Sequence, residues 1–168
     1  MEKFFDMTLL ILQGAEVTLE IFFVTLILSL PIGALAALGR ISSFAPIRYL
    51  MEFYVWIMRG TPLMLQLLFV YFALPMVGIM LPDVAAALLA FTLNYAAYFA
   101  EIIRGGIQSI DKGQYEAAEI LGYSKSQTFF VIILPQVVKR ILPPVTNEVI
   151  TLVKDTSLAF ALAYNEMF

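Results

Sequence analysis

Long apolar runs dominate this chain and limit the folds open to it. A membrane span takes ~20 mostly apolar residues, and four stretches approach or meet that length: residues 21–38, 63–81, 84–100 and 145–164. Hydrophobic residues make up 61% of the 168 and charged residues 14%, whereas a soluble domain is about half apolar and about a quarter charged. The sequence therefore predicts an all-α integral membrane protein with four visible spans.

The segments around the first and fourth spans allow further expectations. Residues 4–14 are predicted to form a short interfacial helix, with apolar side chains on one side. The residues between the first and second runs are interpreted as a loop. Pro143 and Pro144 are expected to start the fourth helix, because a proline in the first turn loses no needed hydrogen bond.

The basic residues indicate an orientation. Eight of the ten fall in the segments between the first and second runs and between the third and fourth: Arg40, Arg48, Arg59, Arg104, Lys112, Lys125, Lys139 and Arg140. Loops rich in lysine and arginine remain cytoplasmic. We therefore expect a cytoplasmic loop between the third and fourth spans and an N-terminus outside.

Several chemistries are excluded by composition. The chain has no cysteine and no histidine, which removes thiol nucleophiles, histidine acid–base catalysis and the usual zinc sites. It also lacks a Gly-x-x-x-x-Gly-Lys-Ser/Thr phosphate loop. The chain alone is therefore not expected to bind and hydrolyse ATP.

The cytoplasmic loop is predicted to be a helical hairpin. Asp111 can cap a first helix, with Gln114 able to reach back, and Gly122 fits the left-handed position that closes it. Ser124 can cap a second helix. That second helix is expected to end before Pro135, because the residue preceding a proline is pushed out of the helical region.

One face of the first hairpin helix could meet another surface. Ala117, Ala118 and Leu121 share that face by helical spacing, and Glu116 and Glu119 flank it with carboxylates. The residues alone leave open whether this hairpin docks a partner or merely covers the bundle. A DNA-binding helix-turn-helix is disfavoured, because its recognition helix would carry more basic residues.

The hairpin resembles a known signature. Glu116-Ala117-Ala118, then Gly122, then residues 132–135 (Ile-Ile-Leu-Pro) match the cytoplasmic motif of permease subunits of binding-protein-dependent ABC importers. Three other stretches resemble the polar amino-acid subgroup of that family: residues 59–62 (Arg-Gly-Thr-Pro), 101–109 and 154–158. The resemblance as a whole covers about residues 10–168.

The resemblance implies a type I importer permease whose single domain covers residues 1–168, with a coupling loop at 106–142. Two such subunits, identical or homologous, would form the pore in a prokaryotic plasma membrane. The hairpin would insert into a cytoplasmic ATPase, which would use ATP and Mg while this chain binds no cofactor. An extracytoplasmic binding protein would deliver a polar amino acid. The coupling contact would comprise Glu116, Ala117, Ala118, Leu121 and Gly122.

The resemblance also raises an expectation about length. Family members usually continue through a fifth membrane helix, whereas this sequence stops directly after its fourth run. The domain is therefore expected to be incomplete at its C-terminal end.

Polar residues inside the spans are candidates for a substrate path. A charge at the middle of a span costs ~2.5–3.5 kcal/mol on insertion scales, so these residues should face the bundle or a water-filled path. Glu148, Thr151 and Asp155 share one stripe, and Lys154 lies on a second stripe beside it. The third span carries a weaker candidate lining: Asn94, Tyr98 and Glu101. Structural hydrogen bonds remain the alternative for both sets.

Two other functional classes are open. An ion-gradient-driven carrier or channel would also need a polar path. Such carriers often have paired broken helices in their two halves, and this sequence shows no internal repeat of that kind. A membrane anchor that only docks a partner would not need the polar residues at 148–155.

Overall fold

The part of the chain that the structure describes is built from helices. The computed structural model describes the backbone of residues 2–165 and the side chains of residues 14–157. Three segments are long and apolar enough to cross a membrane: Gly14–Arg40, Asp83–Gln108 and Lys125–Ser157. Two consecutive helices, Ala45–Gly60 and Leu63–Met76, pass the same test together but are bent by 105°. The expected all-α membrane fold is confirmed, and the second apolar run is half of a bent pair.

The first helix, α1 (Glu2–Arg40), is continuous and contains Pro31. The separate interfacial helix expected at residues 4–14 is therefore wrong, because the backbone there belongs to α1. Membrane helices tolerate an internal proline better than soluble ones. The loop expected between the first two runs is also wrong, since it contains a helix of 16 residues, α2 (Ala45–Gly60). Its charged residues lower its hydropathy, which hid it from a search for apolar runs.

A sharp break follows α2. The next helix, α3 (Leu63–Leu68), begins after Thr61 and Pro62, both of which have extended backbone conformations. The proline favours this conformation at Thr61, because its ring disfavours the helical region for the preceding residue. The chain continues through a π-helical segment, η1 (Phe69–Ala73), into α4 (Leu74–Met76).

Two π-helical segments each stand directly before a Leu-Pro pair. One is η1, before Leu74-Pro75, and the other is η2 (Thr128–Ile133), before Leu134-Pro135. A proline ring clashes with the carbonyl one turn earlier and has no N–H to donate. A wider π turn relieves that conflict without ending the helix.

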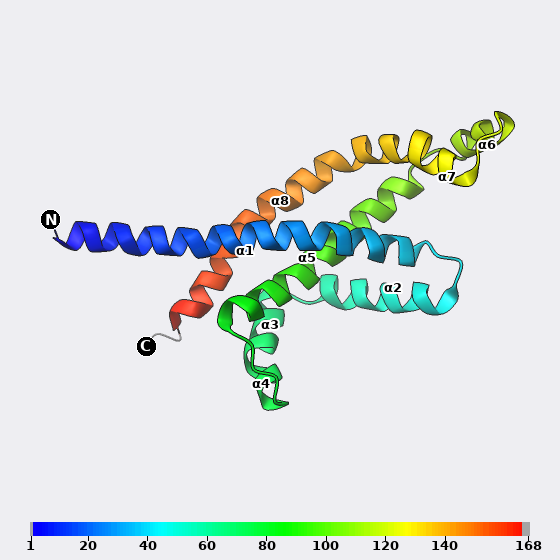
Figure 1. The fold of residues 1–168 in the computed structure, drawn as a ribbon. Helices are drawn as coiled ribbons and strands as arrows, with labels where there is room; N and C mark the ends of the chain where they lie inside the picture. Colours follow the sequence, from blue (N-terminus) through cyan, green and yellow to red (C-terminus); the bar gives the residue numbers. More distant parts are fainter. Residues whose placement is uncertain (1, 166–168) are drawn as a thin grey trace.

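The last helix, α8 (Leu134–Asn165), follows η2 without interruption and contains Pro143 and Pro144. Two expectations are therefore wrong: the hairpin helix does not end before Pro135, and the double proline does not start a helix. The lost hydrogen bonds are accommodated within one long helix, which curves along its length (Figure 1). The hairpin and the last span are thus mechanically continuous.

The centre of the bundle is α5 (Asp83–Gln108), which packs against α1, α2, α3 and α8 (Figure 1). Its buried face is rich in alanine, including Ala96 and Ala100, each 0% exposed. Gly33 of α1 lies against this face: a Cβ at Gly33 would stand 2.8 Å from the Ala96 carbonyl oxygen and 2.8 Å from the Phe99 Cβ. Small residues on both helices therefore allow their backbones to approach closely.

The hairpin lies at one end of the molecule, beyond the paired ends of α5 and α8 (Figure 1). It comprises α6 (Lys112–Ile120) and α7 (Lys125–Gln127), which leads into η2. A small apolar cluster of Ile110, Ile133 and Val137 joins it to the bundle. The hairpin therefore sits on a packed base.

Candidate functional site

A pocket of about 610 Å³ opens at the break between α2 and α3. The break residues 60–64 form one wall of it, and α5 and α8 form the others. Five of the residues expected on a substrate path line this pocket together: Asn94, Tyr98, Glu148, Thr151 and Asp155. The structure thus brings two stripes that are about fifty residues apart in sequence to one cavity.

The pocket has an acidic wall on α8. Glu148 and Asp155 both line it, and the hydroxyl of Tyr95 donates a hydrogen bond of 2.7 Å to Oδ2 of Asp155. Tyr95, a residue of α5, is itself 2% exposed and packs in the hydrophobic core of the bundle. A rigid aromatic side chain therefore fixes the position of this carboxylate.

Lys154 lines neither this pocket nor its neighbour. Its side chain is exposed. Successive residues of a helix point about 100° apart, so Lys154 points away from the pocket that the adjacent Asp155 lines. The basic side chain that lines the pocket is instead Arg59, at the end of α2. Arg59 is not among the site residues predicted from the sequence, because it lies in a segment interpreted as a loop, although the Arg-Gly-Thr-Pro stretch marks the helix break.

Asn94 has a structural partner at the break. Its amide nitrogen donates to the Met58 carbonyl oxygen at 3.1 Å and to Oε1 of Gln66 at 3.1 Å. Gln66 in turn donates to the Met58 carbonyl at 2.9 Å and to Oγ1 of Thr61 at 2.7 Å. These amides satisfy carbonyl groups that the broken helix leaves free, so Asn94 holds the pocket wall in place.

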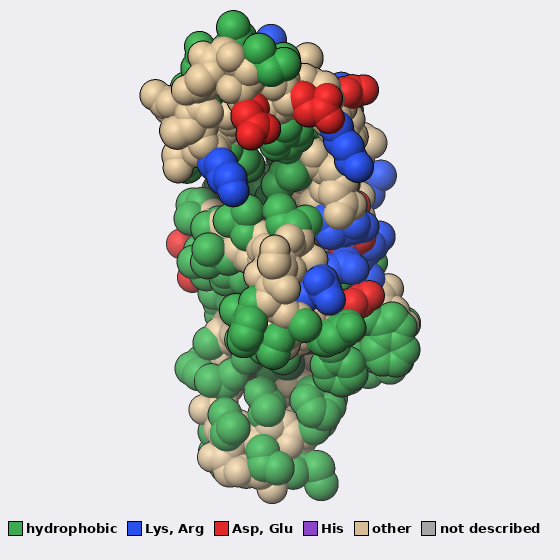
Figure 2. Space-filling model, turned by 90° about the vertical axis from the view of Figure 1, so that its right-hand side faces the viewer, with side chains coloured by type: hydrophobic (Ala, Val, Ile, Leu, Met, Phe, Trp, Pro, Cys, Tyr) green, Lys and Arg blue, Asp and Glu red, His purple; other side chains and the backbone are tan. Residues whose placement is uncertain are grey.

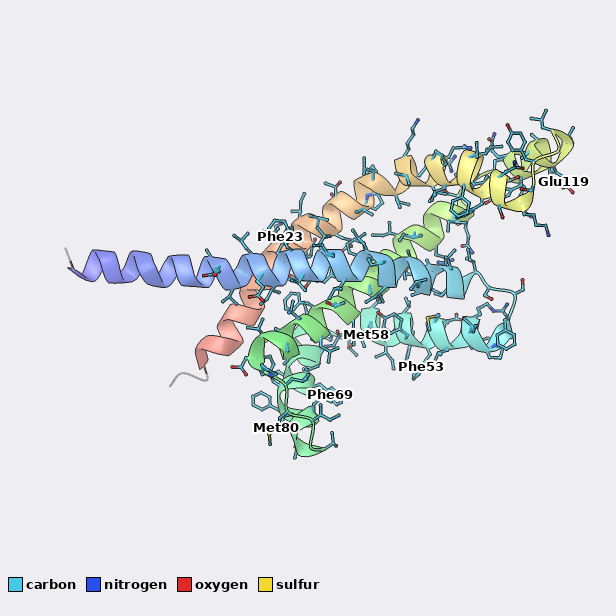
Figure 3. The ribbon with its side chains drawn as sticks, viewed as in Figure 1. Phe23, Phe53, Met58, Phe69, Met80 and Glu119 are labelled. Atoms are coloured by element: carbon cyan, nitrogen blue, oxygen red, sulfur yellow. The ribbon has the colours of Figure 1, made fainter. Side chains whose placement is uncertain are left out.

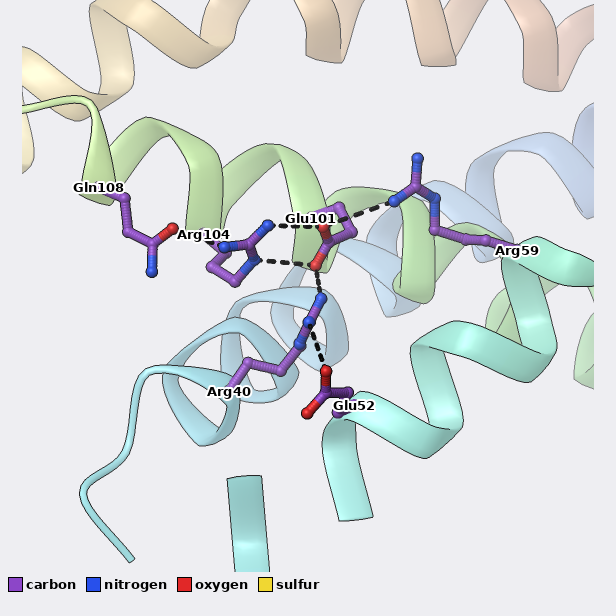
Figure 4. A network of polar contacts seen from close by, with 6 residues as sticks. All are labelled: Arg40, Glu52, Arg59, Glu101, Arg104 and Gln108. Atoms are coloured by element: carbon purple, nitrogen blue, oxygen red, sulfur yellow. Dashed lines mark hydrogen bonds and ion pairs between the residues drawn. The ribbon is translucent and has the colours of Figure 1, made fainter. Parts of the chain in front are cut away.

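Glu101 is the centre of an ion-pair network (Figure 4). Its carboxylate accepts from Arg40 of α1 and from Arg104, whose Nη2 lies 2.8 Å from Oε2, and Arg59 Nη1 stands 3.5 Å from Oε2. Arg40 also stands 3.9 Å from Glu52 of α2. Glu101 therefore joins α1, α2 and α5 by charge.

The Glu101 network borders a second pocket of about 700 Å³. Arg59, Gly60 and Tyr98 line both pockets, while Glu101 lines only this second one. The expected grouping of Asn94, Tyr98 and Glu101 is thus divided between two neighbouring cavities.

The hairpin has the caps that its sequence suggested, with one difference. Ser124 and Gln127 form a reciprocal capping box, and Gly122 has a φ of 79°, the left-handed conformation that favours glycine. The Asp111 side chain accepts from the Gly113 N–H at 2.7 Å. Gln114 does not pair back with it in the described hydrogen bonds, because its side chain accepts a 3.1 Å bond from Gln136 of α8.

The outer surface of the hairpin carries acidic and apolar side chains, together with the exposed Lys112 and Lys125. Glu116, Ala117 and Gly122 are exposed, as is Leu121 at 73%. Ala118 is 1% exposed and faces the inside of the hairpin, so it supports this surface without forming it. Figure 3 shows Glu119 at this end. Figure 2 shows acidic side chains there with basic side chains beside them, and further basic side chains lower on one side.

Comparison with known proteins identifies this arrangement. Residues 29–167 match the model of the family described as binding-protein-dependent transport system inner membrane component. The chain belongs to this permease family. As a member of it, this permease is a multi-pass inner-membrane transport subunit of an ABC importer and not an enzyme, and such systems include an ATPase and a binding protein.

Relatives of this permease include amino-acid transport subunits. It is 42% identical over 158 residues to the arginine transport system permease protein ArtQ of Bacillus subtilis, covering 94% of this chain and 72% of ArtQ. It is 37% identical over 155 residues to the L-cystine transport system permease protein TcyB of the same organism, covering 92% and 66%. The permease thus spans about seven tenths of the ArtQ length.

A solved structure shares the fold of this permease. The crystal structure of an amino acid ABC transporter with histidines aligns with a TM-score of 0.88 at 36% identity, covering 96% of this chain and 75% of that one. An inward-facing structure of the MetNI methionine ABC transporter aligns with a TM-score of 0.73 at 24% identity, which shows the fold alone.

Proposed function

We propose that this permease carries polar amino acids along a path through the pocket at the α2–α3 break, driven by a separate ATPase that engages the hairpin. The observation that carries the proposal is the convergence of Asn94, Tyr98, Glu148, Thr151 and Asp155 on one cavity between helices. Charged and polar groups in membrane proteins are concentrated at substrate paths. The relatives named for arginine and L-cystine support an amino-acid substrate.

The proposed coupling surface comprises Glu116, Ala117, Leu121 and Gly122, with Ala118 buried beneath it. Exposed carboxylates and an exposed leucine suit a basic and apolar groove on the ATPase. ATP and Mg belong to that ATPase, and this chain needs no cofactor of its own. The hairpin lies on the cytoplasmic side and the N-terminus outside, as the positions of the basic residues indicate. A second permease subunit completes the pore, and an extracytoplasmic binding protein delivers the amino acid.

Asp155→Asn should reduce uptake at least tenfold, because it removes the carboxylate that Tyr95 holds in the pocket. Uptake of labelled polar amino acids, among them L-arginine and L-cystine, would be measured in vesicles that contain the complete importer. Lys154→Gln is the matched control: it changes the neighbouring charge outside the pocket and should leave uptake within about twofold of wild type. Unchanged uptake in Asp155→Asn would contradict the proposed path.

Glu116→Lys and Gly122→Asp should each abolish co-purification with the ATPase while the membrane bundle stays folded. The first reverses a charge on the exposed face, and the second places a side chain where the backbone has a positive φ. Glu16→Lys is the control, since it makes the same charge reversal at an exposed position in the N-terminal half of α1, away from the hairpin. Retention of the ATPase by both hairpin variants would argue against coupling through this surface.

A further inference from the structure

Arg59 occupies a position between two pockets. It lines both the pocket at the α2–α3 break and the neighbouring pocket beside the Glu101 network. Its side chain is 43% exposed, and its guanidinium lies 5.2 Å above the ring centre of Tyr98. The group is therefore accessible from the pocket and supported by an aromatic ring.

The contact with Arg59 is the longest of the three ion pairs that Glu101 makes with arginines. Its N–O distance is 3.5 Å, beyond hydrogen-bond length, whereas Arg104 approaches to 2.8 and 3.0 Å and Arg40 is also hydrogen-bonded. Glu101 would keep two cationic partners if Arg59 turned away. The guanidinium of Arg59 can therefore leave Glu101 and donate hydrogen bonds to another group. This change destabilises the network little, because Arg40 and Arg104 stay paired with Glu101.

The opposite wall of the pocket carries the complementary charge. Glu148, Thr151 and Asp155 line it from α8, and Lys154 does not. A free amino acid carries an α-carboxylate and an α-ammonium group, so it needs one cationic and one anionic partner. A guanidinium can hold a carboxylate through two parallel hydrogen bonds. Among the described residues that line this pocket, Arg59 is the one basic side chain.

We infer that Arg59 determines specificity for amino acids by binding the α-carboxylate of the substrate in the pocket at the α2–α3 break, exchanging its loose contact with Glu101 for that carboxylate. The ammonium group then faces the acidic wall on α8. Tyr98 supports the guanidinium in either position. This inference rests on the proposed function and adds to it the orientation of the amino acid in the pocket, with the carboxylate toward Arg59 and the ammonium group toward α8.

The test compares each amino acid with the amine that lacks its α-carboxylate. The probes are agmatine against L-arginine and cystamine against L-cystine, used for whichever amino acid the wild-type importer takes up. Each is added to the purified complete importer without its binding protein, and the concentrations that displace the labelled amino acid are measured. The variants are Arg59→Gln and Arg59→Lys, with Arg48→Gln as a control on the same helix. Arg48 lies over Tyr49 at 5.3 Å and lines neither pocket.

Wild type and Arg48→Gln should prefer the amino acid to the amine by about tenfold or more, as loss of hydrogen bonds to a charged group predicts. Arg59→Gln should bring that ratio close to one by weakening the amino acid while the amine is unaffected, and Arg59→Lys should lie between. An unchanged ratio in Arg59→Gln, or equal weakening of amine and amino acid, would overturn the inference. Failure of the wild type to transport any amino acid would instead overturn the proposed function.

Discussion

Replacing Glu101 by glutamine should lower the stability of the purified permease by ~2 kcal/mol, because the pair is partly buried and lies between the ranges for exposed and for buried ion pairs. The substitution keeps the size of the side chain and removes its charge. Arg40 and Glu101 have side chains that are 16% and 17% exposed. Arg40 would then retain only the 3.9 Å contact with Glu52 as its ion pair in the described part of the chain. The measurement is the midpoint of unfolding in detergent.

Glu52→Gln is the matched control for this prediction. It removes the same charge from the same network, but Glu52 is 55% exposed and makes the longer contact. Exposed ion pairs contribute about 0–1 kcal/mol, so the midpoint should move little. If Glu52→Gln destabilised the permease as much as Glu101→Gln, the network would not be centred on Glu101.

Substituting Gly33 should disrupt the packing of α1 on α5. Gly33→Ala should cost ~1–3 kcal/mol through overpacking, because the added Cβ meets the Ala96 carbonyl oxygen and the Phe99 Cβ, both at 2.8 Å. A carbonyl belongs to the backbone and cannot rotate aside as a side chain does. Gly33→Leu should leave no folded protein. The measurements are the yield of monodisperse protein in detergent and its thermal midpoint.

Gly105→Ala provides the contrast for Gly33→Ala. Gly105 lies in α5, and a Cβ there has nothing within 4 Å. Alanine is favoured over glycine in a helix by up to ~1 kcal/mol, so this variant should be neutral or stabilising. Equal losses in the two variants would show that the tight contact between Gly33 and α5 contributes nothing.

The caps of α6 and α7 in the hairpin show how far local sequence could predict the fold. The cap at Ser124, the left-handed Gly122 and the side-chain acceptor of Asp111 are local devices, and the structure contains all three. The expected pairing of Gln114 with Asp111 failed because a distant partner, Gln136 of α8, competes for the same side chain. Local chemistry decides a helix terminus unless tertiary contacts offer a better partner.

The prolines show the opposite limit. Pro135 was expected to end a helix and Pro143-Pro144 to begin one, but all three lie inside α8. A soluble helix would lose too much from the missing N–H groups. In this bundle a π turn before Pro135 absorbs the strain, and helical backbone is strongly favoured wherever lipid offers no alternative hydrogen bonds.

Hydropathy, capping and helical period can be read from the residues alone, and they specify a helical membrane protein, the turn of its hairpin and the polar stripe of α8. Which charges meet depends instead on how the helices pack. The break at Thr61-Pro62 turns α3 away from α2 and places Arg59 opposite Glu148 and Asp155, whereas Lys154, adjacent in sequence to Asp155, lies outside the pocket. The direction in which a side chain points is set by how its helix is rotated in the bundle, and that rotation follows from packing among helices distant in the chain.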